Sequence, residues 1–86
     1  MNDNVFKDIG LNIVFHRKLR GINQAECARR ANIGVAKLSR IERGLSVEDI
    51  PLKVYLQIAE ALQVELCHLL KSTAVDVKMV RVKKAE

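Results

Sequence analysis

Residues that end or begin helices recur at short intervals along most of the chain. Gly21, Asn32 and Gly44 are of types that tolerate the left-handed backbone conformation in which helices commonly end. Pro51 is favoured in the first turn of a helix. Because apolar residues fill the intervals at helical spacing, we expect several short helices packed around one core.

The apolar spacing between these signals predicts five helices and an all-α fold. The expected helices cover about residues 4–20, 24–31, 35–43, 52–62 and 65–70. Asn23 is expected to cap the second helix through its side chain. The apolar positions expected to mark the fourth helix are Leu52, Tyr55, Leu56, Ala59 and Leu62, with Ile58 beside them.

The first expected helix carries two apolar stripes. Phe6, Ile9 and Ile13 fall on one side and are assigned to the core. Leu11, Phe15 and Leu19 repeat every four residues on a different face. Since one helix of a small domain rarely needs two stripes, we expect the second stripe to meet a different structure.

After Lys71 the pattern changes to β-branched residues in near-alternation. Residues 74–82 read AVDVKMVRV, which predicts a short β-strand with Val75, Val77 and Met79 on one face and Val80 and Val82 on the other. A strand in a helical protein must find a pairing partner. We therefore divide the chain into a helical domain, residues 1–71, and a C-terminal strand and tail, residues 72–86, expected to serve dimerisation.

Length and charge narrow the possible functions. The 86 residues suit one domain, and 15 Lys and Arg against 10 Asp and Glu give a net charge of +5, which favours nucleic acid as a partner. The chain has too short an apolar run to cross a membrane and no apolar signal segment, so we expect a cytoplasmic protein. In that compartment Cys27 and Cys67 are expected to stay reduced.

The segment INQAECARRANIGVAKLSRIERG, residues 22–44, has the outline of two short helices joined by a tight turn and ended by glycine. It resembles the lambda-repressor-like, Cro/repressor-type helix-turn-helix family, also called the XRE family. The matching residues are Gly21, Ile22, Asn23, Gln24, Glu26, Ala28, Ile33, Leu38, Ser39, Arg40, Ile41, Glu42, Arg43 and Gly44. The resemblance covers about residues 5–70 and implies a five-helix domain that binds double-stranded DNA through its third helix.

The resemblance also implies roles for individual residues. Those expected to face base edges are Val35, Ala36, Lys37 and Arg40, and those expected to contact phosphates are Asn23, Gln24 and Arg43. Arg17 and Glu42 match a pair that ties the first helix to the third. This chain departs from the family in having Gly34 as a weaker helix cap and in its apolar Val35 and Ala36, which shifts base discrimination toward Lys37 and Arg40. For Arg29 and Arg30, a solvated helix face and phosphate contact remain equal alternatives.

One helix-turn-helix contacts only a half-site, so we expect a homodimer that acts as a transcriptional regulator, a repressor, on a pseudo-palindromic operator. The residues expected at its interface are Leu66, Leu69, Leu70, Val75, Val77, Met79, Val80 and Val82. The alternatives are the antitoxin of a toxin–antitoxin pair, with a protein partner on the C-terminal strand, a restriction–modification controller, and a protein-interaction module that does not read DNA.

The sequence offers no enzyme motif, so we expect no catalysis and no cofactor. It lacks a glycine-rich phosphate loop, a metalloprotease motif and a nucleophile elbow. Cys67 and His68 have no second pair of ligands at zinc-site spacing, so no metal site is expected. For Cys67 a redox role and an idle surface thiol are both open.

Overall fold

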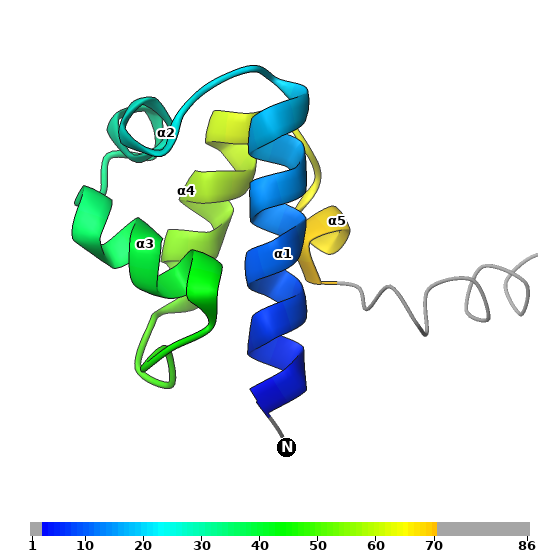
Figure 1. The fold of residues 1–86 in the computed structure, drawn as a ribbon, viewed down its shortest axis with the longest axis vertical. Helices are drawn as coiled ribbons and strands as arrows, with labels where there is room; N and C mark the ends of the chain where they lie inside the picture. The colour runs from blue at the N-terminus through cyan, green and yellow to red at the C-terminus, as the bar shows by residue number, and fades with distance from the viewer. Residues whose placement is uncertain (1–2, 71–86) are drawn as a thin grey trace, which may run out of the picture.

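The computed structural model describes residues 3–70, and in this part of the chain every regular element is a helix (Figure 1). The five helices are α1 (Asp3–Leu19), α2 (Gln24–Ala31), α3 (Val35–Arg43), α4 (Leu52–Leu62) and α5 (Leu66–Leu70). The predicted all-α class is confirmed, and the predicted helix ends agree to within one residue. The predicted strand at residues 74–82 and the boundary after residue 71 lie outside the described residues.

Local signals set the helix ends where the sequence places them. The Asn23 Oδ1 accepts a hydrogen bond of 2.8 Å from the Glu26 backbone N–H and so caps α2. Helices α2, α3 and α4 are each followed by a C-cap residue in the left-handed conformation, namely Asn32, Gly44 and Gln63. Gly34 precedes α3 without a side-chain cap, as its lack of a side chain requires.

Helix α1 lies between α3 on one side and α5 on the other, and α2 and α4 close the core (Figure 1). Its core face is the predicted one, with Ile9 and Ile13 buried and Phe6 packed against them. The second stripe is exposed, as its separate face predicts: Leu11, Phe15 and Leu19 are 63%, 59% and 67% accessible.

The predicted apolar face of α4 is partly wrong. Tyr55, Ala59 and Leu62 are buried as expected, but Leu52 and Leu56 are 60% and 45% exposed. Ile58, predicted beside them, is also buried, and the one buried residue of α4 that was not predicted is Val54. Helix α4 packs against α2, α5 and α1, and the Gln57 Nε2 donates to the Ala31 carbonyl of α2 at 2.7 Å.

The two cysteines have opposite environments. Cys27 is fully buried, and burial, followed by the nearby Glu42 carboxylate, raises the pKa of its thiol. It therefore acts as a small core residue. Cys67 is exposed and, like Cys27, is a free thiol. Within residues 3–70 no helix is long and apolar enough to cross a membrane.

Gly10 lets α1 and α3 approach each other closely. A Cβ atom at this position would lie 2.3 Å from the Glu42 backbone oxygen and 2.7 Å from that of Ile41. Backbone atoms cannot move aside as the end of a flexible side chain can. The absence of a side chain at Gly10 therefore sets how deeply α3 seats against α1.

We expect Gly10→Ala to reduce the free energy of unfolding by about 1–3 kcal/mol, because the added methyl group must push α1 away from α3. Urea unfolding followed by circular dichroism measures the change. Gly34→Ser is the matched control, since a Cβ there meets nothing within 4 Å and serine is a favoured N-cap residue. Equal stability of the wild type and Gly10→Ala would contradict the proposed close approach.

Candidate nucleic-acid interface

Helices α2 and α3 are joined by the three-residue turn 32–34 and form a helix-turn-helix. One side of α3 is buried through Leu38, Ile41 and Glu42. Since successive residues of a helix are rotated by about 100°, Ala36, Arg40 and Arg43 lie on the side away from the core. The second helix of the motif thus presents a polar and basic face to the outside.

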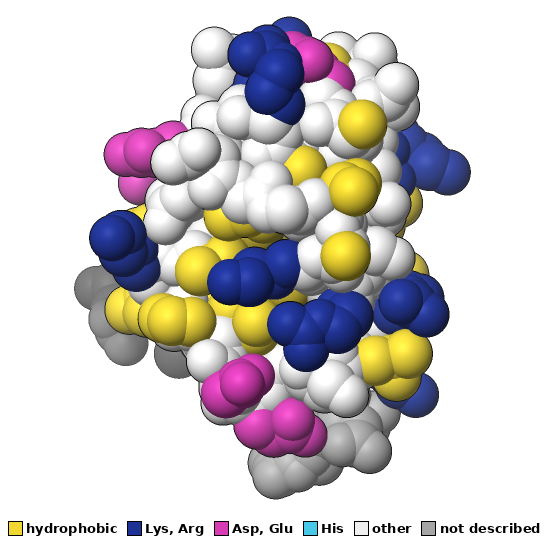
Figure 2. Space-filling model, turned by 90° about the vertical axis from the view of Figure 1, so that its left-hand side faces the viewer, with side chains coloured by type: hydrophobic (Ala, Val, Ile, Leu, Met, Phe, Trp, Pro, Cys, Tyr) yellow, Lys and Arg dark blue, Asp and Glu magenta, His cyan; other side chains and the backbone are white. Residues whose placement is uncertain are grey.

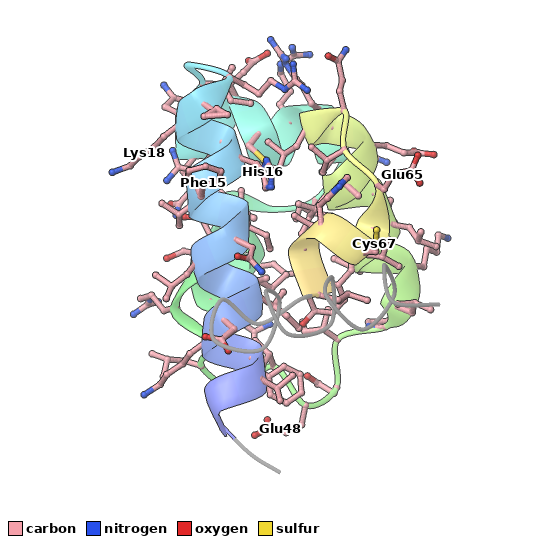
Figure 3. The ribbon with its side chains drawn as sticks, turned by 90° about the vertical axis from the view of Figure 1, so that its right-hand side faces the viewer. Phe15, His16, Lys18, Glu48, Glu65 and Cys67 are labelled. Atoms are coloured by element: carbon pink, nitrogen blue, oxygen red, sulfur yellow. The ribbon has the colours of Figure 1, made fainter. Side chains whose placement is uncertain are left out.

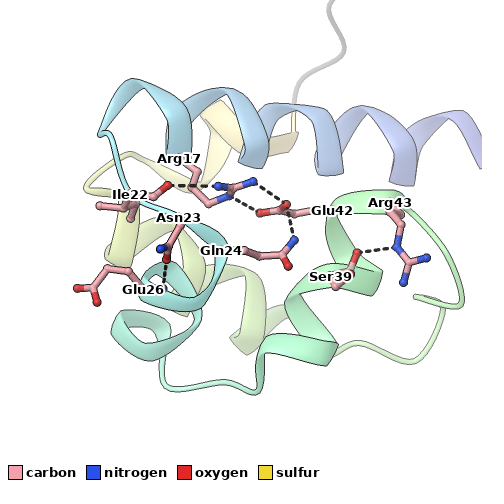
Figure 4. Close-up of polar contacts among 8 residues, drawn as sticks. All are labelled: Arg17, Ile22, Asn23, Gln24, Glu26, Ser39, Glu42 and Arg43. Atoms are coloured by element: carbon pink, nitrogen blue, oxygen red, sulfur yellow. Dashed lines mark hydrogen bonds and ion pairs between the residues drawn. The ribbon is translucent and has the colours of Figure 1, made fainter.

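A buried ion pair fixes α3 to α1. The Arg17 Nε donates to the Glu42 Oε2 at 2.8 Å and the Arg17 Nη2 to the Glu42 Oε1 at 3.2 Å (Figure 4). The two side chains are only 13% and 5% exposed. The Arg17 Nη1 also donates to the Ile22 carbonyl at 3.2 Å. This geometry is the bidentate pairing that a guanidinium and a carboxylate favour, and the predicted structural pair is confirmed.

Gln24 connects α2 to the same carboxylate. Its Nε2 donates to the Glu42 Oε1 at 2.9 Å, so this carboxylate joins α1, α2 and α3 (Figure 4). Gln24 stands in the first turn of α2, directly after the Asn23 cap. The amide is therefore held at the positive end of the helix dipole, where a phosphate is favoured.

Of the residues predicted to face bases, Ala36 and Arg40 lie on the outer side of α3, whereas Val35 and Lys37 lie on its flanks. Val35 and Ala36 are exposed, and Lys37 and Arg40 are half-buried. The Arg40 Nη1 donates to the Ser46 carbonyl at 2.9 Å, which holds its guanidinium toward the loop that follows α3. Arg43, predicted to contact phosphate, is exposed, and its Nε donates to the Ser39 carbonyl at 3.3 Å (Figure 4).

Ser46 is a residue of this site that the sequence did not predict. Its backbone is in the left-handed region, with φ of 52°. Its own carbonyl oxygen accepts the hydrogen bond from Arg40. Serine visits that region far less readily than glycine or asparagine. No residue type at this position signalled the turn.

Arg29 and Arg30 on α2 share one carboxylate. The Arg29 Nη2 and the Arg30 Nε lie 2.6 and 2.7 Å from the Glu26 Oε2. Hydrogen bonds from Arg29 first and then from Arg30 lower the pKa of Glu26 to about 2. Both arginines are exposed, which is compatible with either predicted alternative, a solvated helix face or contact with phosphates.

Basic side chains are spread across the α2–α3 side of the molecule, with apolar side chains between them (Figure 2). Acidic side chains lie toward the edges of this face (Figure 2). A mixed face of this kind can bind an anionic backbone and contact apolar groups such as thymine methyls.

The predicted dimer interface needs one correction. Leu69 is fully buried inside the domain, where it fills the core beneath α5, and cannot offer its side chain to another molecule. Leu66 is half-buried and Leu70 is 43% exposed. The other predicted interface residues, Val75, Val77, Met79, Val80 and Val82, lie outside the described residues. Among residues 3–70, no three His, Cys, Asp or Glu side chains are placed to hold a metal ion.

Comparison with known proteins agrees with this geometry. A family model described as helix-turn-helix matches residues 16–69. The hypothetical transcription factor NHTF from Neisseria has a similar structure, with a TM-score of 0.77 and 24% identity over 92% of this chain and 90% of that one. The restriction–modification controller protein C.AhdI from Aeromonas hydrophila gives a TM-score of 0.69 and 23% identity over 74% of this chain and 94% of its own. These two structures share the fold. No curated protein matches the chain significantly.

We expect Glu42→Leu to lower the free energy of unfolding by about 3–5 kcal/mol, because it leaves Arg17 charged and largely buried without its partner. Urea unfolding measures the loss. The double variant Arg17→Met with Glu42→Leu serves as the control and should recover most of the stability, since no buried charge then remains unpaired. A single variant as stable as the wild type would show that the pair does not hold α3.

Proposed function

The chain belongs to the helix-turn-helix family of DNA-binding transcriptional regulators, of the Cro/repressor type, and we propose that it is a sequence-specific repressor acting as a homodimer on a pseudo-palindromic operator. In this proposal α3 enters the major groove. The dimer represses by occupying the operator, without catalysis, in the cytoplasm where the DNA is.

The observation that carries the proposal is the division of α3 into two faces. One face is buried against the domain through Leu38 and Ile41 and is fixed there by the ion pair between Glu42 and Arg17. The other presents Arg40 and Arg43 to the outside, and a guanidinium can donate two hydrogen bonds to guanine O6 and N7. A recognition helix needs this combination, because base contacts discriminate only when the helix is held in one orientation.

Within this proposal the residues divide into two groups. Lys37 and Arg40 carry base discrimination, while Val35 and Ala36 pack against the groove floor or thymine methyls. Asn23, Gln24 and Arg43 position the domain on phosphates. The bond from Gln24 to Glu42 supports its role, because the amide that would meet the phosphate backbone is already oriented by α3.

The test is selection of bound duplexes from a random-sequence DNA library at near-physiological salt, followed by sequencing. We expect enrichment of a two-fold site whose half-sites are about one helical turn apart. Binding without enrichment, lost as the salt concentration rises, would indicate phosphate attraction alone and would overturn the operator model.

In the same selection, Arg40→Ala should relax the preference at one base position of each half-site, which corresponds to about 1–3 kcal/mol of lost discrimination. Arg43→Ala is its matched comparison on the same helix. It should weaken binding to all sequences alike and reduce the salt dependence by about one charge per subunit. An unchanged preference in Arg40→Ala would show that the reading face has been assigned wrongly.

A further inference from the structure

An apolar stripe on α1 has no role in the proposed DNA contact. We call Leu11, Phe15 and Leu19 the α1 stripe; their side chains are 63%, 59% and 67% exposed. They follow one another by four residues and extend over about 12 Å of the helix. Gly10, which meets α3, is separated from Phe15 by about 140° around α1. The stripe and the DNA-binding face therefore point in different directions, and both can be occupied at once.

The α1 stripe borders the place where the chain leaves the helical domain. The Phe15 ring lies edge-on to the His16 ring, with 5.1 Å between the ring centroids (Figure 3). The His16 ring centroid is 6.2 Å from that of His68 on α5. The Asn12 Nδ2 donates to the Leu69 carbonyl at 2.9 Å, which anchors the end of α5 beside the middle of α1. The last residue of α5, Leu70, is 43% exposed. The described part of the chain thus ends at Leu70, close to the stripe.

The length and pattern of residues 71–86 fit a segment that covers such a surface. The five residues that follow Leu70, through Val75, span up to about 17 Å when extended, so Val75 can reach any point of the stripe. From Val75 onward every second residue through Met79 is apolar, so an extended segment has one apolar face for α1. From Val75 to Met79 this apolar face spans about 13 Å, close to the length of the stripe, which favours contact between them.

The backbone hydrogen bonds of a strand at residues 74–82 favour a partner segment from another copy of the chain. A strand leaves its N–H and C=O groups to be satisfied, and residues 3–70 form helices and loops with no strand edge to offer. The same segment of a second copy supplies that edge. Around a two-fold axis two such segments would run antiparallel and could pair with each other.

We propose that residues 74–82 of a second copy cover the α1 stripe, so that each chain of the dimer lays its C-terminal segment across α1 of the other. This inference rests on the homodimer of the proposed function and names the surface that holds it together. The DNA-binding faces stay free, because the stripe lies on a different side of α1 from α3.

Sedimentation equilibrium of the DNA-free, full-length protein tests the surface. Phe15→Ser should raise the dimer dissociation constant about 100-fold or more, because a two-fold dimer loses two buried phenyl rings. Leu52→Ser on α4 is the matched control, since Leu52 is 60% exposed, and should stay dimeric. Leu19→Ser repeats the test within the stripe, and circular dichroism verifies that each variant folds.

Disulfide trapping tests the occupant. In a Cys67→Ser background, chains carrying Lys18→Cys are mixed with chains carrying Val77→Cys and oxidised; a disulfide between the two chains is expected. Lys18 is exposed on α1 one turn from Phe15, so this variant keeps the Phe15 ring. Leu52→Cys in place of Lys18→Cys should give none. A chain carrying both Lys18→Cys and Val77→Cys that closes an internal disulfide at high dilution would show that the segment docks on its own domain, which overturns the second-copy assignment.

The outcomes separate this inference from the proposed function. If the wild type is a dimer, Phe15→Ser is equally dimeric and no disulfide forms between the chains, the α1 stripe is not the dimer surface. That result overturns this inference and leaves the operator-binding dimer in place. A wild-type protein that stays monomeric both free and on the selected DNA overturns the homodimer and this inference together. Loss of sequence enrichment in a protein whose disulfide forms overturns only the DNA proposal.

Discussion

The carboxylate of Glu42 holds the helix-turn-helix in its geometry. It receives Arg17 from α1 through two hydrogen bonds and Gln24 from α2 through a third, while its own backbone belongs to α3. Three helices thus meet at one buried charge. Because a bidentate pair is directional, it fixes the rotation of α3 about its axis as well as its distance. The outward direction of Arg40 and Arg43 is a consequence of this inward bond.

Gly10 complements that charge at the same helix crossing. The ion pair pulls α3 toward α1, and the missing side chain of Gly10 allows the backbones to come close. Helix α1 therefore has two functional sides. One side packs against α3 and fixes its position, and another side exposes the apolar α1 stripe. In our proposals the first side serves DNA and the second serves the partner copy, so the same rigid helix sets the spacing between two recognition helices.

The sequence predicted features that depend on local chemistry. The cap at Asn23 and the ends at Asn32 and Gly44 follow from the residues themselves, and the helix bounds came out within one residue. The buried face of α4 depends on which side its neighbours occupy, so Leu52 and Leu56, predicted on its apolar face, are exposed. In the site, the Arg17–Glu42 pair was predictable from the family pattern. The bond from Arg40 to Ser46 was not, because it needs a left-handed serine that no composition signal marks.

The carboxylate of Glu26 bears on how the proposed regulator would meet DNA that is not its operator. With Arg29 and Arg30 both bound to it, the outer end of α2 carries less free positive charge than two arginines suggest. A phosphate that approaches there must compete with a carboxylate already in place. In a protein that binds an operator as we propose, weaker attraction to arbitrary sequence would shorten each unproductive encounter. Glu26 would then be one of the residues that limit the residence time on DNA that α3 does not recognise.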